Sequence, residues 1–196
     1  MKKLYITLLL AMAAITSTQA QIAEVKVNLA MGAIAIVNTS YEMGFGEGTH
    51  SSLTFDYVGA FAEENYMGTG HPFVISMGLF GYRYYLRDDH QGFFFGADAG
   101  LDAFRMNKEI SITVNDPYNR YDVGYGYILG TTLGYKYRFN ERWSAEASFS
   151  FGYQNCRHEG YDDEGVRLFD LNTSAEWIPY KGGIYLSYNI LSRRKK

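Results

Sequence analysis

Cysteine and proline are scarce in this chain of 196 residues. Cys156 is the only cysteine, so we expect neither an intrachain disulfide nor a lipid-bearing cysteine near the start. The chain has only 3 prolines, against 21 glycines and 18 tyrosines, and 17% of its residues are aromatic. This composition favours many strands and few helices.

An excess of charge of one sign is also lacking. The chain carries 18 Lys and Arg against 21 Asp and Glu, a formal net charge of -3. Removal of a leader containing Lys2 and Lys3 would give -3 - 2 = -5. Such a mild balance, without the basic patch that nucleic acid requires, predicts no nucleic-acid partner.

Long apolar runs are absent after the first twenty residues. Residues 1–20 combine Lys2 and Lys3, an apolar run over 4–15 and a small-residue exit ending at Ala20. This pattern is typical of a cleaved secretory signal peptide, and the run is shorter than the roughly 20 residues of a transmembrane helix. We therefore expect a signal at 1–20 and a single domain over 21–196.

The strongest positive signal is a strict period of two over residues 124–154, interrupted by a tight turn at 140–142. This period predicts two paired strands. Aromatic residues cluster at both ends of the apolar face, with Leu129, Thr131 and Leu133 between them. The aromatic residues of this predicted girdle are Tyr125, Tyr127, Tyr135, Tyr137, Phe139, Trp143 and Tyr153.

The spacing of the aromatic residues suits a membrane. Ten positions separate Tyr127 from Tyr137, and at roughly 3.3 Å per residue and a tilt of about 40° they span about 25 Å along the membrane normal. The opposite face is mostly Gly, Ser and Thr, residues that suit a narrow lumen better than an exposed surface. The apolar face is therefore predicted to face lipid.

Further alternating segments extend this pattern along the chain. We expect the other strands at 24–31, 39–45, 51–61, 73–86, 93–104 and 181–190, with Arg83 pointing inward. Short turns alternate with longer connections at 62–72, 106–123 and 157–179. The predicted fold is all-β: an antiparallel up-and-down transmembrane β-barrel of about eight strands, with short periplasmic turns and longer extracellular loops.

Nine charged residues fall on the predicted inner faces. They are Lys26, Glu42, Asp56, Arg83, Asp98, Asp102, Lys136, Arg138 and Glu146. Eight strands enclose a space that side chains just fill, so five acids and four bases must pair or hold water. A structural ion-pair network is the favoured interpretation, and a proton or ion path is the alternative.

The sequence predicts no catalytic, cofactor or metal site. The four histidines are scattered, and none forms an HExxH pair. The acidic run Asp162-Asp163-Glu164-Gly165 lacks the ligand spacing of a calcium loop.

Several motifs carry a family resemblance over nearly all of the mature chain. They are Lys26-x-Asn28-Leu29, Glu42, Arg83-Tyr84-Tyr85, and Gly134-Tyr135 through Arg142-Trp143 to Gly152-Tyr153. The chain resembles small eight-stranded outer-membrane barrels of Bacteroidota grouped as a domain of unknown function, similar in architecture to OmpX-type and OmpA-type barrels. The resemblance implies no established activity.

The end of the chain is similar to the signal read by the outer-membrane insertion machinery. The matching residues are Lys181-x-Gly183-x-x-Leu186-x-Tyr188, although this chain continues to the basic tail 193–196. The resemblance implies the insertion machinery as a partner during assembly.

Two functions from different classes remain open. The first is a structural or surface-interaction protein of the bacterial outer membrane, exported through the periplasm, contacting lipid and presenting its loops to an extracellular partner. The second is a secreted soluble calycin-like barrel that binds an apolar ligand inside.

Overall fold

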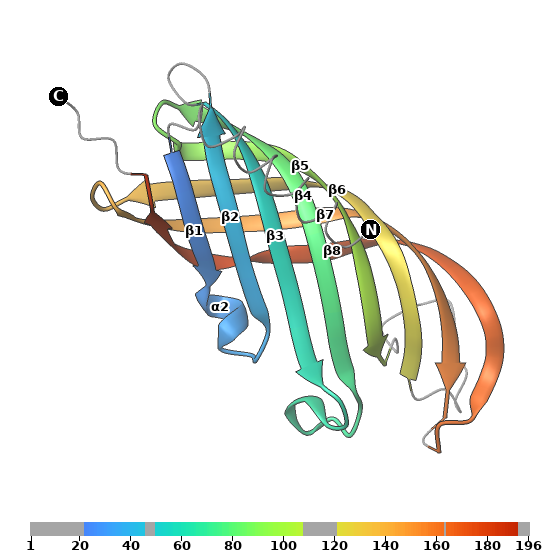
Figure 1. Ribbon diagram of the computed structural model, residues 1–196. Helices are drawn as coiled ribbons and strands as arrows, with labels where there is room; N and C mark the ends of the chain where they lie inside the picture. Colours follow the sequence, from blue (N-terminus) through green and yellow to red (C-terminus); the bar gives the residue numbers. More distant parts are fainter. Residues whose placement is uncertain (1–21, 46–49, 108–120, 163, 192–196) are drawn as a thin grey trace, which may run out of the picture.

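The computed structural model describes residues 22–45, 50–107, 121–162 and 164–191, which form a closed antiparallel β-barrel (Figure 1). Its strands are β1 (Ile22–Asn28), β2 (Val37–Phe45), β3 (Ser51–Ala62), β4 (Phe73–Arg87), β5 (Gln91–Met106), β6 (Tyr121–Arg138), β7 (Trp143–Tyr161) and β8 (Arg167–Asn189). Each strand pairs with its neighbours in the chain, and β8 pairs with β1 to close the ring. The predicted eight-stranded, up-and-down, all-β fold is confirmed.

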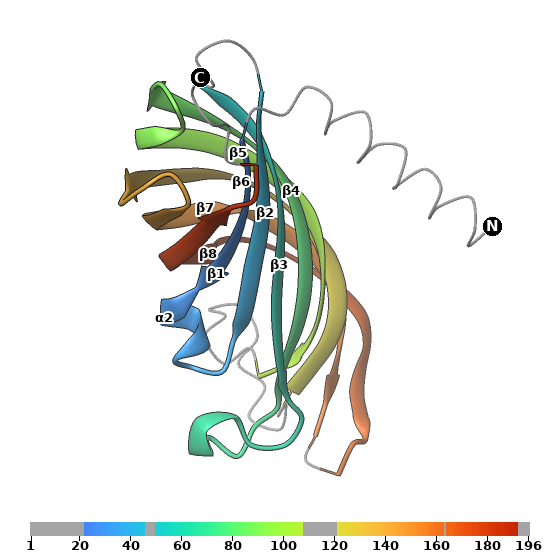
Figure 2. The ribbon, with the colours of Figure 1, turned by 60° about the vertical axis from the view of Figure 1, so that its left-hand side comes forward.

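The two ends of the barrel differ (Figure 2). One end carries the turns between β4 and β5 and between β6 and β7. In the latter, the Asn140 side chain accepts hydrogen bonds from the backbone N–H of Arg142 and Trp143, both at 2.9 Å. The other end carries the short helices α2 (Leu29–Gly32) and η2 (Tyr66–Gly68). We call these the turn end and the helix end.

Burial alternates along the strands as the period of two predicts. On β2, Asn38, Ser40, Glu42 and Gly44 are buried, whereas the intervening residues are half-buried or exposed. On β4, Arg83 points inward and Phe80 and Tyr82 point outward. Large apolar side chains therefore cover the outside of the barrel.

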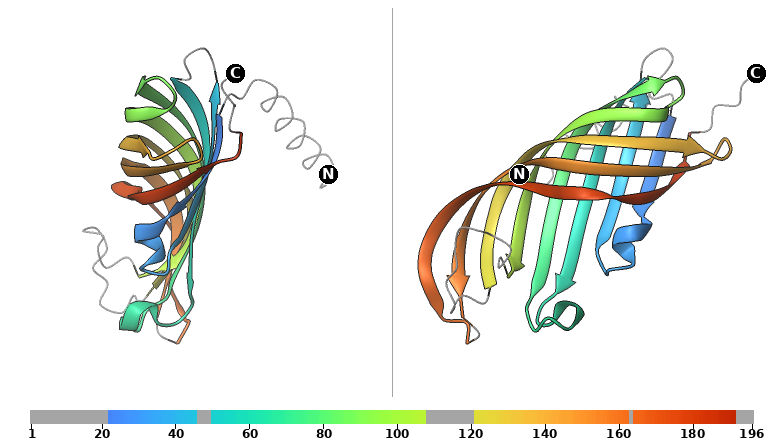
Figure 3. Two further views of the ribbon diagram at one scale, coloured as in Figure 1. Left: turned by 90° about the vertical axis from the view of Figure 1, so that its left-hand side faces the viewer. Right: turned by 180° about the vertical axis from the view of Figure 1, so that it is seen from behind.

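The barrel wall is interrupted near the helix end (Figure 3). β1 ends at Asn28, which lies opposite Tyr185, so in the described part of the chain residues 167–184 of β8 pair with β7 alone. The Asn28 side chain accepts a hydrogen bond from Met31 N at 3.1 Å, which caps α2 and ends the strand.

Three predicted boundaries need correction. Residues 157–179 were predicted as a loop, but they form the paired ends of β7 and β8 around a short turn, because backbone pairing between the strands continues even along 170–173 of β8, where burial does not alternate. Residues 29–31, predicted as strand, form α2 instead, because the Asn28 cap starts a helix there. Within the predicted loop 106–123, Met106 belongs to β5 and residues 121–123 to β6, since both are held in the β5–β6 ladder.

Several other predictions fall on residues outside the described part of the chain. These are the signal peptide at 1–20, the turn at 46–49, the loop residues 108–120 and the basic tail at 193–196.

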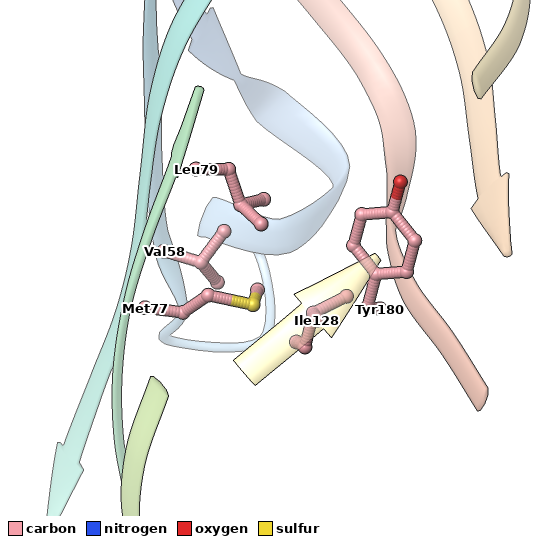
Figure 4. Packing of buried hydrophobic residues seen from close by; sticks show 5 residues of the cluster. All are labelled: Val58, Met77, Leu79, Ile128 and Tyr180. Carbon is pink, nitrogen blue, oxygen red and sulfur yellow. The ribbon is translucent and has the colours of Figure 1, made fainter. Parts of the chain in front are cut away.

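A small apolar core lies inside the barrel toward the helix end (Figure 4). It consists of Val58, Met77, Leu79, Ile128 and Tyr180. These five side chains come from β3, β4, β6 and β8, so they bridge the lumen. They separate a strongly polar region on the turn side from a cavity on the helix side.

Gly152 allows β6 and β7 to approach closely under Tyr180. A Cβ atom at Gly152 would lie 2.5 Å from the Leu129 carbonyl oxygen and 2.6 Å from Gly130 Cα, both backbone atoms. We expect Gly152→Ala to lower the free energy of unfolding by about 1–3 kcal/mol, the usual cost of overpacking. Urea unfolding followed by tryptophan fluorescence would measure the change.

Gly78→Ala is the matched control, because a Cβ at this strand glycine has no atom within 4 Å. Its free energy of unfolding should stay constant or rise slightly. Equal losses in the two variants would contradict the close approach at Gly152.

Candidate functional site in the barrel lumen

A cluster of buried charges fills the turn-side half of the lumen. The Lys26 ammonium forms ion pairs with both Glu42 and Glu146. Arg83 Nη1 lies 2.8 Å from Glu146 Oε1 and 3.6 Å from Glu42 Oε2. All four side chains are at most 1% exposed, so water does not screen these interactions.

Lys136 extends this cluster toward the turn end. Its ammonium pairs with Glu24 and lies 3.9 Å from Glu42 Oε2. Arg138 sits at the rim, 18% exposed, with Nη2 4.0 Å from Glu24 Oε1 and 2.6 Å from the Asp89 carbonyl oxygen, to which it donates. These side chains lie on the turn side of the apolar core, and we call them the lower charge cluster: Glu24, Lys26, Glu42, Arg83, Lys136 and Glu146.

A second group of polar side chains lies next to the apolar core. Lys181 Nζ is 2.8 Å from Asp56 Oδ2 and 3.5 Å from Asp98 Oδ2. Asp98 also accepts hydrogen bonds from the Thr132 hydroxyl and, at 2.8 Å, from the Tyr180 hydroxyl.

Asp102 lies farther toward the helix end than this group. It accepts a 2.7 Å hydrogen bond from the Gln154 side chain. The structure thus places all nine sequence-predicted lumen residues inside the barrel or at its rim, in three separate environments.

The lower charge cluster is balanced, with three acids and three bases, and its members hydrogen-bond to one another. The Tyr85 hydroxyl adds a 2.8 Å hydrogen bond to Glu42. A closed set of partners suits a structural role better than a reactive one, because reaction needs a group that substrate can reach. Within the described residues, no group of three or more His, Cys, Asp or Glu side chains could hold a metal ion.

The aromatic residues of the predicted girdle point away from this site. Tyr125, Tyr127, Tyr135, Tyr137, Phe139 and Trp143 are all more than 40% exposed on the outer surface. Tyr153 is half-buried and contacts the Trp177 ring at 5.8 Å between centroids. No helix in the described part of the chain is long and apolar enough to cross a membrane.

Comparison with known proteins gives the chain a family. The family model described as "Protein of unknown function (DUF3575)" matches residues 6–190. The chain belongs to this family. No curated protein and no solved structure was found to match it.

Sequence reasoning missed two members of the lumen network in this DUF3575 chain, Glu24 and Lys181. Glu24 shares the inner face of β1 with Lys26, two residues away, so the period of two could have identified it. The register of β8 shifts between Pro179, the partner of Phe151, and Lys181, the partner of Ser150. Tyr180 and Lys181 are both buried at this shift. A shift of this kind breaks the alternation on which the prediction rested.

His90 closes the turn end of the lumen. Its ring is fully buried, stacks on Tyr85 at 4.8 Å between centroids, and lies where a Cβ of Gly44 would be 1.8 Å from its Cε1 atom. Burial lowers the pKa of His90 to about 4, although the nearby Glu42 carboxylate opposes this shift. The sequence placed His90 in a turn but gave no sign that its ring enters the barrel.

Glu146→Leu tests the lower charge cluster. The substitution leaves Lys26 and Arg83 buried without one of their carboxylates, so the free energy of unfolding should fall by about 3 kcal/mol. Urea unfolding measures it, with Glu141→Leu, at an exposed turn position, as the control that should change little. A loss of less than about 0.5 kcal/mol from Glu146→Leu would mean that water screens the cluster.

His90 gives the barrel a pH dependence of known sign. Between pH 6.5 and about 4 the unfolded chain binds a proton that folded His90 does not, so stability falls as the pH drops through this window. The slope from this one group is at most about 1.4 kcal/mol per pH unit. His90→Asn suits the positive φ of 52° and removes the titration.

The measurement is the difference in unfolding free energy between wild type and His90→Asn across this range of pH. The carboxylates contribute the same pH dependence to the stability of both proteins, so their contribution cancels in this difference. A difference that stays constant with pH would show that His90 is solvated.

Proposed function

We propose that this protein is an integral outer-membrane β-barrel with a plugged lumen, whose role is structural or one of surface interaction and not catalytic. A single observation carries the proposal: the distribution of side chains is inverted. Of the described residues, 24 buried ones are polar or charged and 13 are hydrophobic, whereas 33 large hydrophobic residues are exposed.

This inversion supports a barrel surrounded by hydrocarbon. Soluble proteins bury their large apolar side chains and rarely expose a continuous apolar surface. A transmembrane barrel instead presents an apolar band bordered by aromatic residues and keeps its polar residues inside. A soluble calycin-like barrel would need a largely apolar lumen, and the lower charge cluster argues against it.

The plugged lumen supports a role without transport. Lys26, Arg83 and Lys136 pair with carboxylates in the turn-side half of the lumen. The apolar core crosses the lumen on the helix side of these pairs. An ion would have to displace these pairs, which is costly in a low dielectric.

The helix end supplies the surface for an external partner. The hairpin of β7 and β8 projects there with Leu168, Leu171 and Asp170 exposed, and the segment between β3 and β4 adds η2. A paired hairpin presents these groups in a fixed arrangement, which lowers the ordering cost of binding. The existence of this external partner is a prediction. So are an origin in Bacteroidota and the recognition of residues 181–188 by the insertion machinery.

Nitroxide labels on the outer surface test the membrane assignment. After Cys156→Ser, one variant carries a label at Leu133, which is 66% exposed in the middle of the apolar band, and another carries a label at Asp170. In liposomes, the label at position 133 should relax with oxygen and resist a polar agent. The label at position 170, beyond the band, should show the reverse.

A soluble barrel predicts a different result, in which both labels are open to the polar agent. That outcome, together with a protein that does not float with the liposomes, would refute the membrane assignment.

A further inference from the structure

We propose that the barrel holds one acyl chain of a membrane lipid in a cavity near its helix end, and that the chain enters sideways between β8 and α2. This inference rests on the proposed membrane location. The cavity has a volume of about 620 Å³, within the range of pockets that hold small molecules. It lies on the helix side of the apolar core, and the core residues Val58, Met77 and Ile128 line it.

The lining of the cavity selects for hydrocarbon. Twelve of its seventeen lining residues are apolar, among them Met31, Ile36 and Ile178 next to the gap in the wall. A site of this kind gains free energy by removing apolar ligand surface from water or from polar headgroups. Transmembrane lumens are normally polar, so an apolar chamber inside one needs a reason beyond folding.

The charges of the cavity decide which part of a lipid can enter. Among the described residues that line it, the charged ones are Asp102 and Glu176, and both are acidic. A phosphate or carboxylate headgroup would gain no cationic partner from these described lining residues, whereas a neutral chain needs none. The chain therefore occupies the cavity while its headgroup stays outside.

The interrupted wall supplies the route. Because β1 stops at Asn28, the edge of β8 from 167 to 184 has no strand beside it in the described chain. Pro179 lies on this edge and has no N–H to leave unsatisfied, and the Asn28 amide donates to the Gly182 carbonyl at 3.0 Å. At these two positions, the open edge therefore leaves fewer backbone groups unsatisfied.

The gap opens onto the apolar outer surface. Trp177 and Ile184 on the outer face of β8 are 69% and 56% exposed, on either side of Pro179. On the opposite side of the gap stands α2, a helix of four residues with none buried. Lipid chains would thus lie against the opening between the edge of β8 and this short helix.

The test uses the full mature chain reconstituted in phosphatidylcholine vesicles that also contain free palmitic acid. After release into a short-chain detergent, native mass spectrometry identifies what each protein molecule retains. Wild type should retain one phosphatidylcholine. Met31→Trp and Ile178→Trp fill the cavity from two sides and should lower this occupancy about tenfold or more, the change that about 1.4 kcal/mol produces.

Leu29→Trp is the matched control, because Leu29 lies on the same short helix but is 54% exposed and does not line the cavity. It should retain lipid as wild type does. Retention of palmitic acid alone, of nothing, or of equal lipid by all variants would overturn the proposal.

Flotation of each variant with the vesicles separates the two proposals. If the proteins float but show one of the overturning results, the membrane assignment stands and the acyl-chain site falls. If wild type does not float, both proposals fall together.

Discussion

Six charged side chains without access to water constrain this barrel more than any other contact. A buried charge that loses its partner costs several kcal/mol, so Glu24, Lys26, Glu42, Arg83, Lys136 and Glu146 must all arrive together. They come from β1, β2, β4, β6 and β7. A shift of one residue in any of these strands would turn its charge outward and leave a partner unpaired. The cluster therefore fixes the strand register as well as filling the lumen.

The same cluster compensates for a weak seam. β1 shares only five paired positions with β8, between Glu24–Asn28 and Tyr185–Asn189, and six with β2, against nine between β2 and β3 and more between the later neighbours. Lys26 of β1 reaches past β8 to Glu146 of β7, 120 residues later in the chain. β1 is thus held by the interior as well as by its edges, and it can be short without opening the barrel at the turn end.

A short β1 divides the lumen into two halves with different chemistry. On the turn side the ring is complete and the interior is ionic. On the helix side the wall is incomplete, because β8 continues paired with β7 alone in the described chain and α2 takes the place of further strand. The cavity on this side is lined mostly by apolar residues, with Asp102 and Glu176 among them. Tyr180 joins the halves: its ring packs in the apolar core, and its hydroxyl donates to Asp98.

The period of two predicted the strands wherever the two faces of the sheet meet different surroundings. It predicted that Arg83 points inward, because a charged side chain on the outer face would be costly. It also predicted the position of the turn at 140–142. The pairs within the lumen could not be predicted in the same way. Lys26 and Glu146 meet only because the ring closes, and no local pattern contains that information. Lys181 was not predicted to face the lumen, because a register shift in β8 changes the face of the sheet on which the later residues of the strand lie.

The failure of the period at 157–179 is informative about the barrel. Along β8, residues 170–173 are all exposed, and alternation of burial begins only at Ser174. Thr173 lies in register with Arg157, which lies in register with Tyr125, the first aromatic residue of the predicted girdle. Beyond this row both faces of β8 are exposed, so no constraint holds its apolar residues to one side, whereas burial on β7 still alternates, with His158 and Gly160 buried. Within it, the faces differ. On β8, the row at which alternation starts coincides with the row at which the aromatic residues of the girdle start, as expected if the proposed membrane begins near Tyr125.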